Sequence, residues 1–150
     1  MARFVYRMQN ILDIKYKLEA QARSDYAVAA AKLAEEEEKL AALYLRKRQY
    51  EQKKKELLED RLNVMDLNLN KKAIDTMKSL IRDQSLQVHI AQRNLEEERK
   101  KLSEIMKDRK THEKLKEHKF EEFKEELKAE ESKEIDQLVS FKHNDTTEEE

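Results

Sequence analysis

Hydrophobic side chains recur at every seventh residue through the second half of the chain. A companion series has the same period and lies three residues closer to the carboxyl end. The main series is Ile74, Ile81, Val88, Leu95, Leu102 and Phe123, with Arg109 and Lys116 in the same phase; the companion series is Met77, Ala91 and Ile105, interrupted by Gln84 and Glu98. This heptad repeat is typical of a long α-helix that packs on another helix along a narrow apolar seam.

The first half has a similar but less regular pattern. Its apolar positions are Phe4, Met8, Ile11, Leu18 and Ala22, followed by Tyr26, Ala29, Leu33, Leu40, Leu43, Tyr50, Leu57, Leu58, Leu62 and Met65. The phase changes between Ala22 and Tyr26, where we expect a local change in supercoiling. The sequence therefore predicts a second long helix with an irregular repeat.

The chain of 150 residues contains no glycine and no proline, the two residues that cost about 1 and about 3 kcal/mol inside a helix. A turn must then come from other residues, and Asn63, Asp66, Asn68 and Asn70 gather near the middle. Asparagine and aspartate tolerate non-helical backbone and cap helices. The prediction is an all-α fold, a single two-helix antiparallel coiled-coil hairpin over residues 1–141 with its turn at 63–70, and a disordered acidic tail at 142–150.

This turn also sets the expected register. Phe4 would face Ser132 to Ile135, and Leu40 would face Glu96 and Glu97, with both termini at one end. The structural alternative is a parallel dimer of two chains whose helices do not fold back on themselves. Its length would approach twice that of the hairpin, so small-angle scattering would distinguish the two.

Composition argues against several classes of function. Charged residues make up 43% of the chain, and 32 basic side chains nearly balance 33 acidic ones, which is unlike a general nucleic-acid binder. The absence of cysteine fits a reducing cytoplasm, and the sequence has no apolar run that would span a bilayer. The four histidines lack metal-ligand spacing. We therefore expect a non-enzyme with no cofactor, no metal site and no membrane insertion.

Lysine and arginine outnumber acidic residues on both sides of the expected turn. A basic tip of this kind fits either an acidic partner or a solvated face. The other end is apolar over much of the helix circumference, because Val5, Tyr6, Leu12 and Ile14 flank the stripe of Phe4, Met8 and Ile11. Either a partner or the second helix covers this end.

Two segments carry a resemblance to a known family. FVYRMQNILDIKYKLEAQA (4–22) leads from aromatic and basic residues into a leucine-containing helix, and EKLKEHKFEEFKEELKAEESKEIDQLV (113–139) closes with an acidic EIDQL. In order and length, the chain from about Phe4 to Phe141 resembles the FliJ family of the bacterial flagellar type III export apparatus. The resemblance implies an antiparallel hairpin similar to the central stalk of rotary ATPases.

The resemblance also implies partners. Paired termini would enter the central pore of the hexameric export ATPase, and the start of the second helix would contact the cytoplasmic domain of the export gate. Some members handle export chaperones as well. The free protein would be a cytoplasmic monomer that associates peripherally with the cell membrane through the export apparatus.

Residue by residue, the implied ATPase-ring site comprises Phe4, Arg7, Met8, Ile11, Leu12, Ile135 and Leu138. The implied export-gate site comprises Ala73, Met77, Leu80 and Gln84, where Ala73 replaces an aromatic of some members. A structural coiled-coil dimerisation protein and a central-stalk subunit of a rotary ATPase are the alternative functions. A stalk subunit would normally be longer and carry a globular part.

Overall fold

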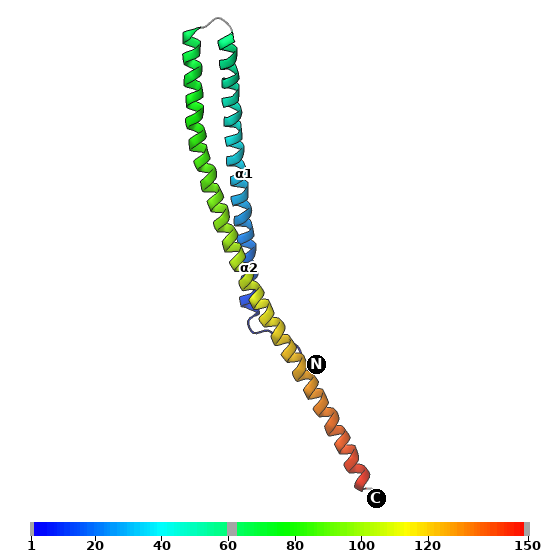
Figure 1. The fold of residues 1–150 in the computed structure, drawn as a ribbon. Coiled ribbons are helices and arrows are strands. Elements are labelled where there is room, and N and C mark those ends of the chain that lie inside the picture. Colours follow the sequence, from blue (N-terminus) through cyan, green and yellow to red (C-terminus); the bar gives the residue numbers. More distant parts are fainter. Residues whose placement is uncertain (1, 60–62, 149–150) are drawn as a thin grey trace. The chain divides into compact units, whose positions relative to one another are not determined.

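The structure is a computed structural model that describes residues 2–59 and 63–148, and side chains up to residue 145. In these ranges the chain forms two α-helices and no strand (Figure 1). Helix α1 spans Gln9–Glu59 and helix α2 spans Val64–Glu148. The prediction of an all-α, antiparallel two-helix coiled-coil hairpin is confirmed.

The chain divides into two compact units, whereas a single hairpin over residues 1–141 was expected. The first unit joins the chain up to Glu19 to the chain from Ile105 onward, and the second is Ala20–Glu104. Each unit pairs one part of α1 with one part of α2 in antiparallel direction. In the second unit, for example, the Asn70 amide donates to the Tyr50 carbonyl at 3.0 Å and the Gln84 amide to the Glu36 carbonyl at 2.9 Å.

Asn63 forms the N-cap of α2. Its side-chain oxygen accepts hydrogen bonds from the backbone N–H groups of Met65 at 3.0 Å and Asp66 at 3.4 Å. These bonds satisfy donors that the first turn of a helix leaves without partners. The negative charge of Asp66, in the first turn, also interacts favourably with the positive end of the helix dipole. Because α2 already begins at Val64, the predicted turn at 63–70 lies too late; residues 60–62 of the connection lie outside the described residues.

The buried side of α1 keeps an uninterrupted alternation of three- and four-residue steps from Leu12 to Tyr50, so the predicted phase change between Ala22 and Tyr26 is wrong. Four of the seam positions hold charged residues, which do not belong to an apolar repeat: Lys15, Glu19, Glu36 and Lys47. The buried or half-buried residues of this seam are Leu12, Lys15, Glu19, Ala22, Tyr26, Ala29, Leu33, Glu36, Leu40, Leu43, Lys47 and Tyr50.

The predicted seam of α2 is confirmed. Ile74, Met77, Ile81, Val88 and Ala91 are buried and form most of the apolar core with Leu12 and Ala22 of α1. The same seam also contains polar members, since Asn70 is buried and Gln84 and Arg109 are half-buried. Each of these three polar residues hydrogen-bonds to α1 across the seam.

Two further expectations are corrected. Phe4 packs on Phe120 and Phe123, not on Ser132 to Ile135, because the earlier turn shifts the register by two helical turns or more. The tail expected to be disordered from residue 142 is helical to Glu148, since no glycine or proline ends the helix.

Candidate protein-binding sites

An aromatic cluster anchors the amino-terminal residues on α2 within the first unit. The Phe4 ring lies 5.1 Å from the Phe120 ring in an edge-to-face arrangement and 5.5 Å from the Phe123 ring, measured between centroids. Such pairs add to the stabilisation from apolar burial. Lys124 places its ammonium 4.6 Å from the Phe120 centroid, within reach of a cation–π attraction.

Two open grooves border this cluster. The larger, of about 550 Å³, is lined by Arg3, Phe4, Val5, Tyr6, Arg7, Met8, Lys119, Glu122, Phe123 and Glu126. The smaller, of about 390 Å³, is lined by Phe4, Leu12, Tyr16, Glu113, Lys116, Glu117 and Phe120. The structure thus brings together four residues of the expected ATPase-ring site, namely Phe4, Arg7, Met8 and Leu12.

The other residues of that expected site lie apart. Ile11 is exposed on the flank of α1. Ile135 and Leu138 belong to a part of α2 in which every residue from 128 to 145 is exposed, and Leu138 lines a shallow hollow with Glu134, Gln137 and Phe141 only. They do not lie opposite Phe4, because the register places Phe120 and Phe123 there.

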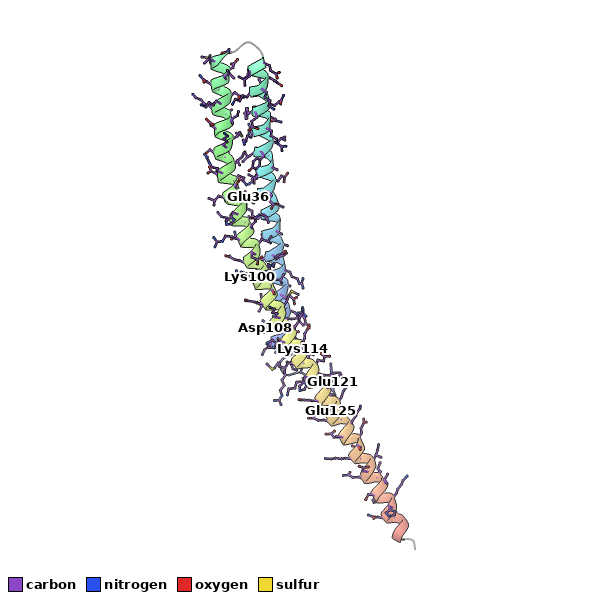
Figure 2. All side chains as sticks on the ribbon, in the orientation of Figure 1. Glu36, Lys100, Asp108, Lys114, Glu121 and Glu125 are labelled. Atoms are coloured by element: carbon purple, nitrogen blue, oxygen red, sulfur yellow. The ribbon has the colours of Figure 1, made fainter. Side chains whose placement is uncertain are left out.

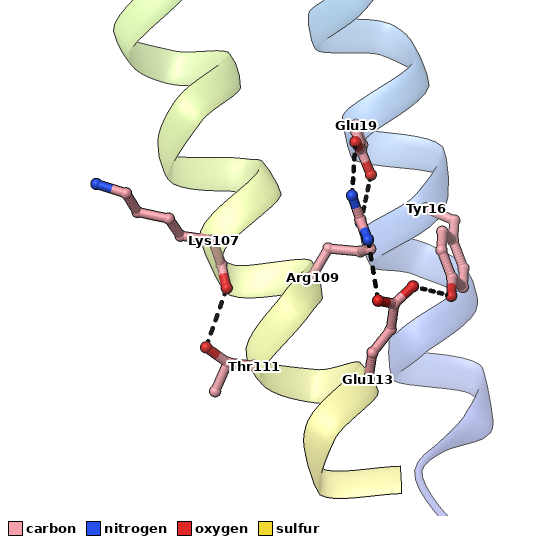
Figure 3. A network of polar contacts seen from close by, with 6 residues as sticks. All are labelled: Tyr16, Glu19, Lys107, Arg109, Thr111 and Glu113. Atoms are coloured by element: carbon pink, nitrogen blue, oxygen red, sulfur yellow. Dashed lines mark hydrogen bonds and ion pairs between the residues drawn. The ribbon is translucent and has the colours of Figure 1, made fainter. Parts of the chain in front are cut away.

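A polar network joins Tyr16 and Glu19 of α1 to Arg109 and Glu113 of α2 within the first unit (Figure 3). The Arg109 guanidinium binds both carboxylate oxygens of Glu19, at 2.7 Å and 3.1 Å, and also donates to Glu113 at 2.9 Å. Tyr16 donates its hydroxyl hydrogen to the other oxygen of Glu113, and its ring lies 6.0 Å from the guanidinium. This bidentate, two-helix arrangement fixes the register of the first unit through geometry that only arginine supplies.

A second ion pair joins the helices nearby. The Lys15 ammonium lies 2.7 Å from Asp108, and His112 lies 3.5 Å from the other oxygen of that carboxylate. The hydrogen bond from Lys15 lowers the pKa of Asp108 below its usual value. The hydrogen bond from Tyr16, followed by Arg109, likewise lowers the pKa of Glu113, although partial burial opposes this shift.

In the second unit, Glu36 plays a comparable part. Its carboxylate accepts the Gln84 amide and pairs with Lys32 at 2.9 Å, and its side chain is only 8% exposed. The hydrogen bond from Gln84, more than that from Lys32, lowers the pKa of Glu36 despite the opposing effect of burial. The ionised carboxylate is therefore stabilised by folding.

We expect Glu36→Gln to reduce thermal stability at neutral pH and to lose that effect in acid. A carboxylate whose pKa is lowered in the folded state stabilises the fold above its unfolded pKa, about 4.3, and ceases to do so as the pH falls through the lower folded pKa. Melting curves of both proteins from pH 7 to pH 3, followed by circular dichroism, measure the difference.

The matched control for this experiment is Glu35→Gln. Glu35 is the neighbouring exposed carboxylate and pairs with Lys39 at 3.3 Å. Its replacement should change the melting temperature little at any pH, because exposed ion pairs contribute little. A Glu36→Gln difference that stays constant down to pH 3 would contradict the role assigned to the Glu36 carboxylate.

The four residues of the expected export-gate site do not form one exposed surface. Met77 is buried in the seam, Ala73 is half-buried, and Gln84 is half-buried and bonded to Glu36. Only Leu80 presents a large exposed apolar side chain. A partner at this position would therefore contact Leu80 on the flank of α2 and not the seam residues beside it.

No cluster of three or more His, Cys, Asp or Glu side chains suited to a metal ion occurs among the described residues. Neither α1 nor α2, within its described length, has a stretch apolar enough to cross a bilayer. Charged side chains surround both helices, including Glu121 and Glu125 on the exposed part of α2 (Figure 2).

Sequence reasoning missed the polar network and Phe120. Arg109 was noted in the heptad phase of α2, and this was the available signal, but nothing in the sequence paired it with Glu19. Phe120 lies outside both heptad series, so its contact with Phe4 depended on a register that the late turn misplaced.

Comparison with known proteins extends over almost the whole chain. The family model described as "Flagellar FliJ protein" matches residues 4–148. A solved structure described as that of a putative YscO homolog, CT670 from Chlamydia trachomatis, superimposes with a TM-score of 0.64 at 20% identity and covers 100% of both chains. At this identity the likeness concerns the fold. No curated protein matches the sequence.

Proposed function

The chain belongs to the FliJ family of flagellar proteins, and from this premise we propose that it enters the central pore of the hexameric flagellar export ATPase and links that ring to the membrane export gate. It is a type III export component by family. In this role it performs no catalysis of its own; it acts by binding partners and by resisting bending, and some export chaperones are further candidates for binding.

The observation that carries the ring proposal is the exposure of the carboxyl-terminal part of α2. From residue 128 to 145 every described side chain is exposed, and Ile135, Leu138, Val139 and Phe141 are among them. Isolated helices of about 12–15 residues are marginal in water, and contiguous exposed apolar groups mark binding surfaces. The grooves around Phe4, Arg7 and Met8 lie in the same unit.

Replacing Ile135 and Leu138 together with aspartate should weaken binding to the purified export ATPase by about tenfold or more, because two charges would have to be desolvated at the contact. Helicity should stay unchanged, since both residues are exposed. Binding is measured by titration of labelled protein with the ATPase, and stimulation of ATP hydrolysis by enzyme assay. Val28→Asp, an exposed position of the second unit, is the control.

Unaltered binding of the doubly substituted protein would contradict the ring proposal for this segment. If the unsubstituted protein neither binds the ATPase nor stimulates it while remaining helical, the function itself is wrong and a structural coiled coil becomes the better assignment.

For the export gate, Leu80→Asp is the informative change. It should weaken binding to the purified cytoplasmic domain of the gate while leaving the melting temperature nearly unchanged. Met77 is unsuitable, because a charge at this buried position would disrupt the seam. Leu86→Asp, on the same helix and also exposed, is the matched control; equal effects of the two substitutions would rule out a specific contact at Leu80.

A further inference from the structure

The second unit has a strongly basic end. Residues 46–59 of α1 and residues 64–82 of α2 contain ten lysines and arginines and five acidic residues. The remaining described residues of the unit, 20–45 and 83–104, contain seven lysines and arginines and ten acidic residues. Because the helices run antiparallel, α1 ends where α2 begins, and the two basic segments lie side by side (Figure 1). The charge of this unit is therefore polarised along its length.

Large apolar side chains are exposed at the same end. Val64, Met65 and Leu69 of α2 are 69%, 72% and 60% exposed. At about 100° per residue, the three side chains fall within an arc of about 140° that is centred opposite the seam. Leu58, close to the end of α1, is also more than half exposed. Pairing of α1 with α2 thus leaves an apolar surface in water at this end of the unit.

Exposed lysines lie among these apolar side chains. Around the axis of α2, Lys72 falls between Val64 and Met65, and Lys71 falls at the edge next to Val64. The same side also holds Asp75, so two ammonium groups accompany one carboxylate. A lysine side chain can lay its methylene groups along an apolar surface while its charged end reaches a polar layer.

This combination matches the surface of a bilayer that contains anionic lipids. Apolar groups on one side of a helix enter the boundary between headgroups and acyl chains, and clustered lysines are attracted to the negative surface. A nucleic acid would contact the lysines through its phosphates but would leave the apolar side chains without a partner. A protein partner would need a surface shaped to a protruding end, whereas lipids rearrange around it.

We propose that the basic end of the second unit binds directly to the surface of a bilayer that contains anionic lipids. Val64, Met65 and Leu69 enter the headgroup layer, and Lys71 and Lys72 lie at the level of the lipid phosphates. The lysines at 53–55 of α1 add attraction over a longer distance, which salt screens. The contact is peripheral, with both helices outside the hydrocarbon core.

Direct contact with lipid goes beyond the proposed function, in which the chain reaches the membrane through the export gate. It also departs from the expectation that membrane association depends on the export apparatus alone. A protein held at the bilayer meets a membrane-embedded gate at a higher local concentration than a freely diffusing one does. The lipid contact itself requires neither the gate nor the ATPase.

Flotation of the full-length protein with vesicles tests the proposal. Vesicles of phosphatidylcholine alone are compared with vesicles that contain about 30% phosphatidylglycerol. The protein should float with the anionic vesicles and stay largely unbound with the neutral ones. Most of the binding should be lost near 1 M salt, where the Debye length falls to about 3 Å. Absence of binding to the anionic vesicles, or equal binding to both kinds, overturns the proposal.

The apolar contribution is tested without any change of charge. Met65→Gln combined with Leu69→Gln should raise the lipid concentration needed for half-maximal binding about tenfold. The matched control is Leu86→Gln combined with Ile90→Gln, because these exposed residues have the same spacing and lie on the same side of α2, three heptads further along. The control should leave binding unchanged; equal losses in the two double variants overturn the proposal.

The lysines are tested in the same paired way. Lys71→Gln combined with Lys72→Gln should weaken binding to the anionic vesicles about tenfold or more. Lys100→Gln combined with Lys101→Gln removes the same charge elsewhere on α2 and should have little effect. All substituted residues are exposed, so circular dichroism should show unchanged helices. Equal losses in these two variants would make binding a response to net charge alone and would contradict the assignment of this surface.

A fluorescent reporter distinguishes a bilayer from an acidic protein. The chain has no tryptophan, so Met65→Trp introduces a single one at the proposed contact. Its emission should shift to shorter wavelength with the anionic vesicles and not with polyglutamate, whereas the emission of Leu86→Trp should shift with neither. A shift with polyglutamate and not with vesicles would assign the surface to an acidic protein and overturn the proposal. Because gate and ATPase are absent from these experiments, their failure leaves the proposed function standing.

Discussion

Leu12→Ala should lower the free energy of unfolding by about 3 kcal/mol, within the range of about 2–5 kcal/mol for large-to-small changes in protein cores. Leu12 is the most deeply buried of the large side chains, with 2% of its surface exposed. Removing three carbons here loses apolar burial and leaves a cavity that two rigid helices cannot close. Urea denaturation followed by circular dichroism measures the loss.

The adjacent residue supplies the control. Ile11 is 40% exposed on the flank of the same helical turn, and Ile11→Ala should change the free energy of unfolding by only about 0.5 kcal/mol. A comparable loss for both variants would mean that helix propensity, and not packing at Leu12, dominates.

Arg109→Leu should reduce the melting temperature by about 5 °C or more, because it leaves the Glu19 carboxylate beside an apolar residue within the seam. Glu19 is buried, and Arg109 supplies two hydrogen bonds to its oxygens. The matched surface control is Arg99→Leu, which breaks an exposed ion pair with Glu96 within one helix and should have a small effect.

The double variant Glu19→Leu, Arg109→Leu distinguishes the cost of removing one partner of a buried ion pair from the worth of the pair. Replacing a buried ion pair by apolar residues is often neutral or stabilising, so the double variant should recover most of the lost melting temperature. If it instead remains as unstable as Arg109→Leu, packing of the guanidinium on Tyr16 contributes more than the charges do.

The apolar part of the seam could be predicted from the sequence. Ile74, Ile81 and Val88 recur at seven-residue spacing, and each is buried against α1. Burial of aliphatic side chains at this period is what drives helix pairing. The heptad pattern in the sequence therefore identifies the face of α2 that packs on α1. The antiparallel hairpin and the absence of strands followed from this pattern and from the missing glycine and proline.

The polar part of the seam could not be predicted in the same way. Glu19 and Glu36 are absent from the apolar pattern of the first half, yet both are buried because Arg109 and Gln84 reach them from α2. A buried carboxylate is tolerable only with a partner, and the identity of the partner depends on the register. Counting apolar residues alone therefore produced a false phase change in α1.

The asparagines near the middle of the chain were grouped as one turn, although they have two different roles. Asn63 caps α2, as asparagine commonly does. Asn70 lies inside α2 and binds the Tyr50 carbonyl across the seam. Grouping the two moved the expected turn toward the carboxyl end, and that error placed Ile135 and Leu138 opposite Phe4, where the structure has Phe120 and Phe123.

The expected partner sites remain predictions in their roles. Of the ring residues, Phe4, Arg7, Met8 and Leu12 gather at two grooves, an arrangement that their nearness in sequence already favoured. Of the gate residues, Met77 is a seam residue. Its burial followed from the heptad repeat, in which Met77 is a companion position of the seam, whereas its place in the gate site came only from the resemblance.

Helix α2 has 85 residues and α1 has 51, and this inequality gives the backbone two very different rates of deuterium uptake. Amide hydrogens around Ile81 exchange only when two helices separate, whereas those of residues 128–145 exchange whenever one lone helix frays. Slowed uptake confined to that lone segment would then time the arrival of any protein that covers it, without a label on either molecule.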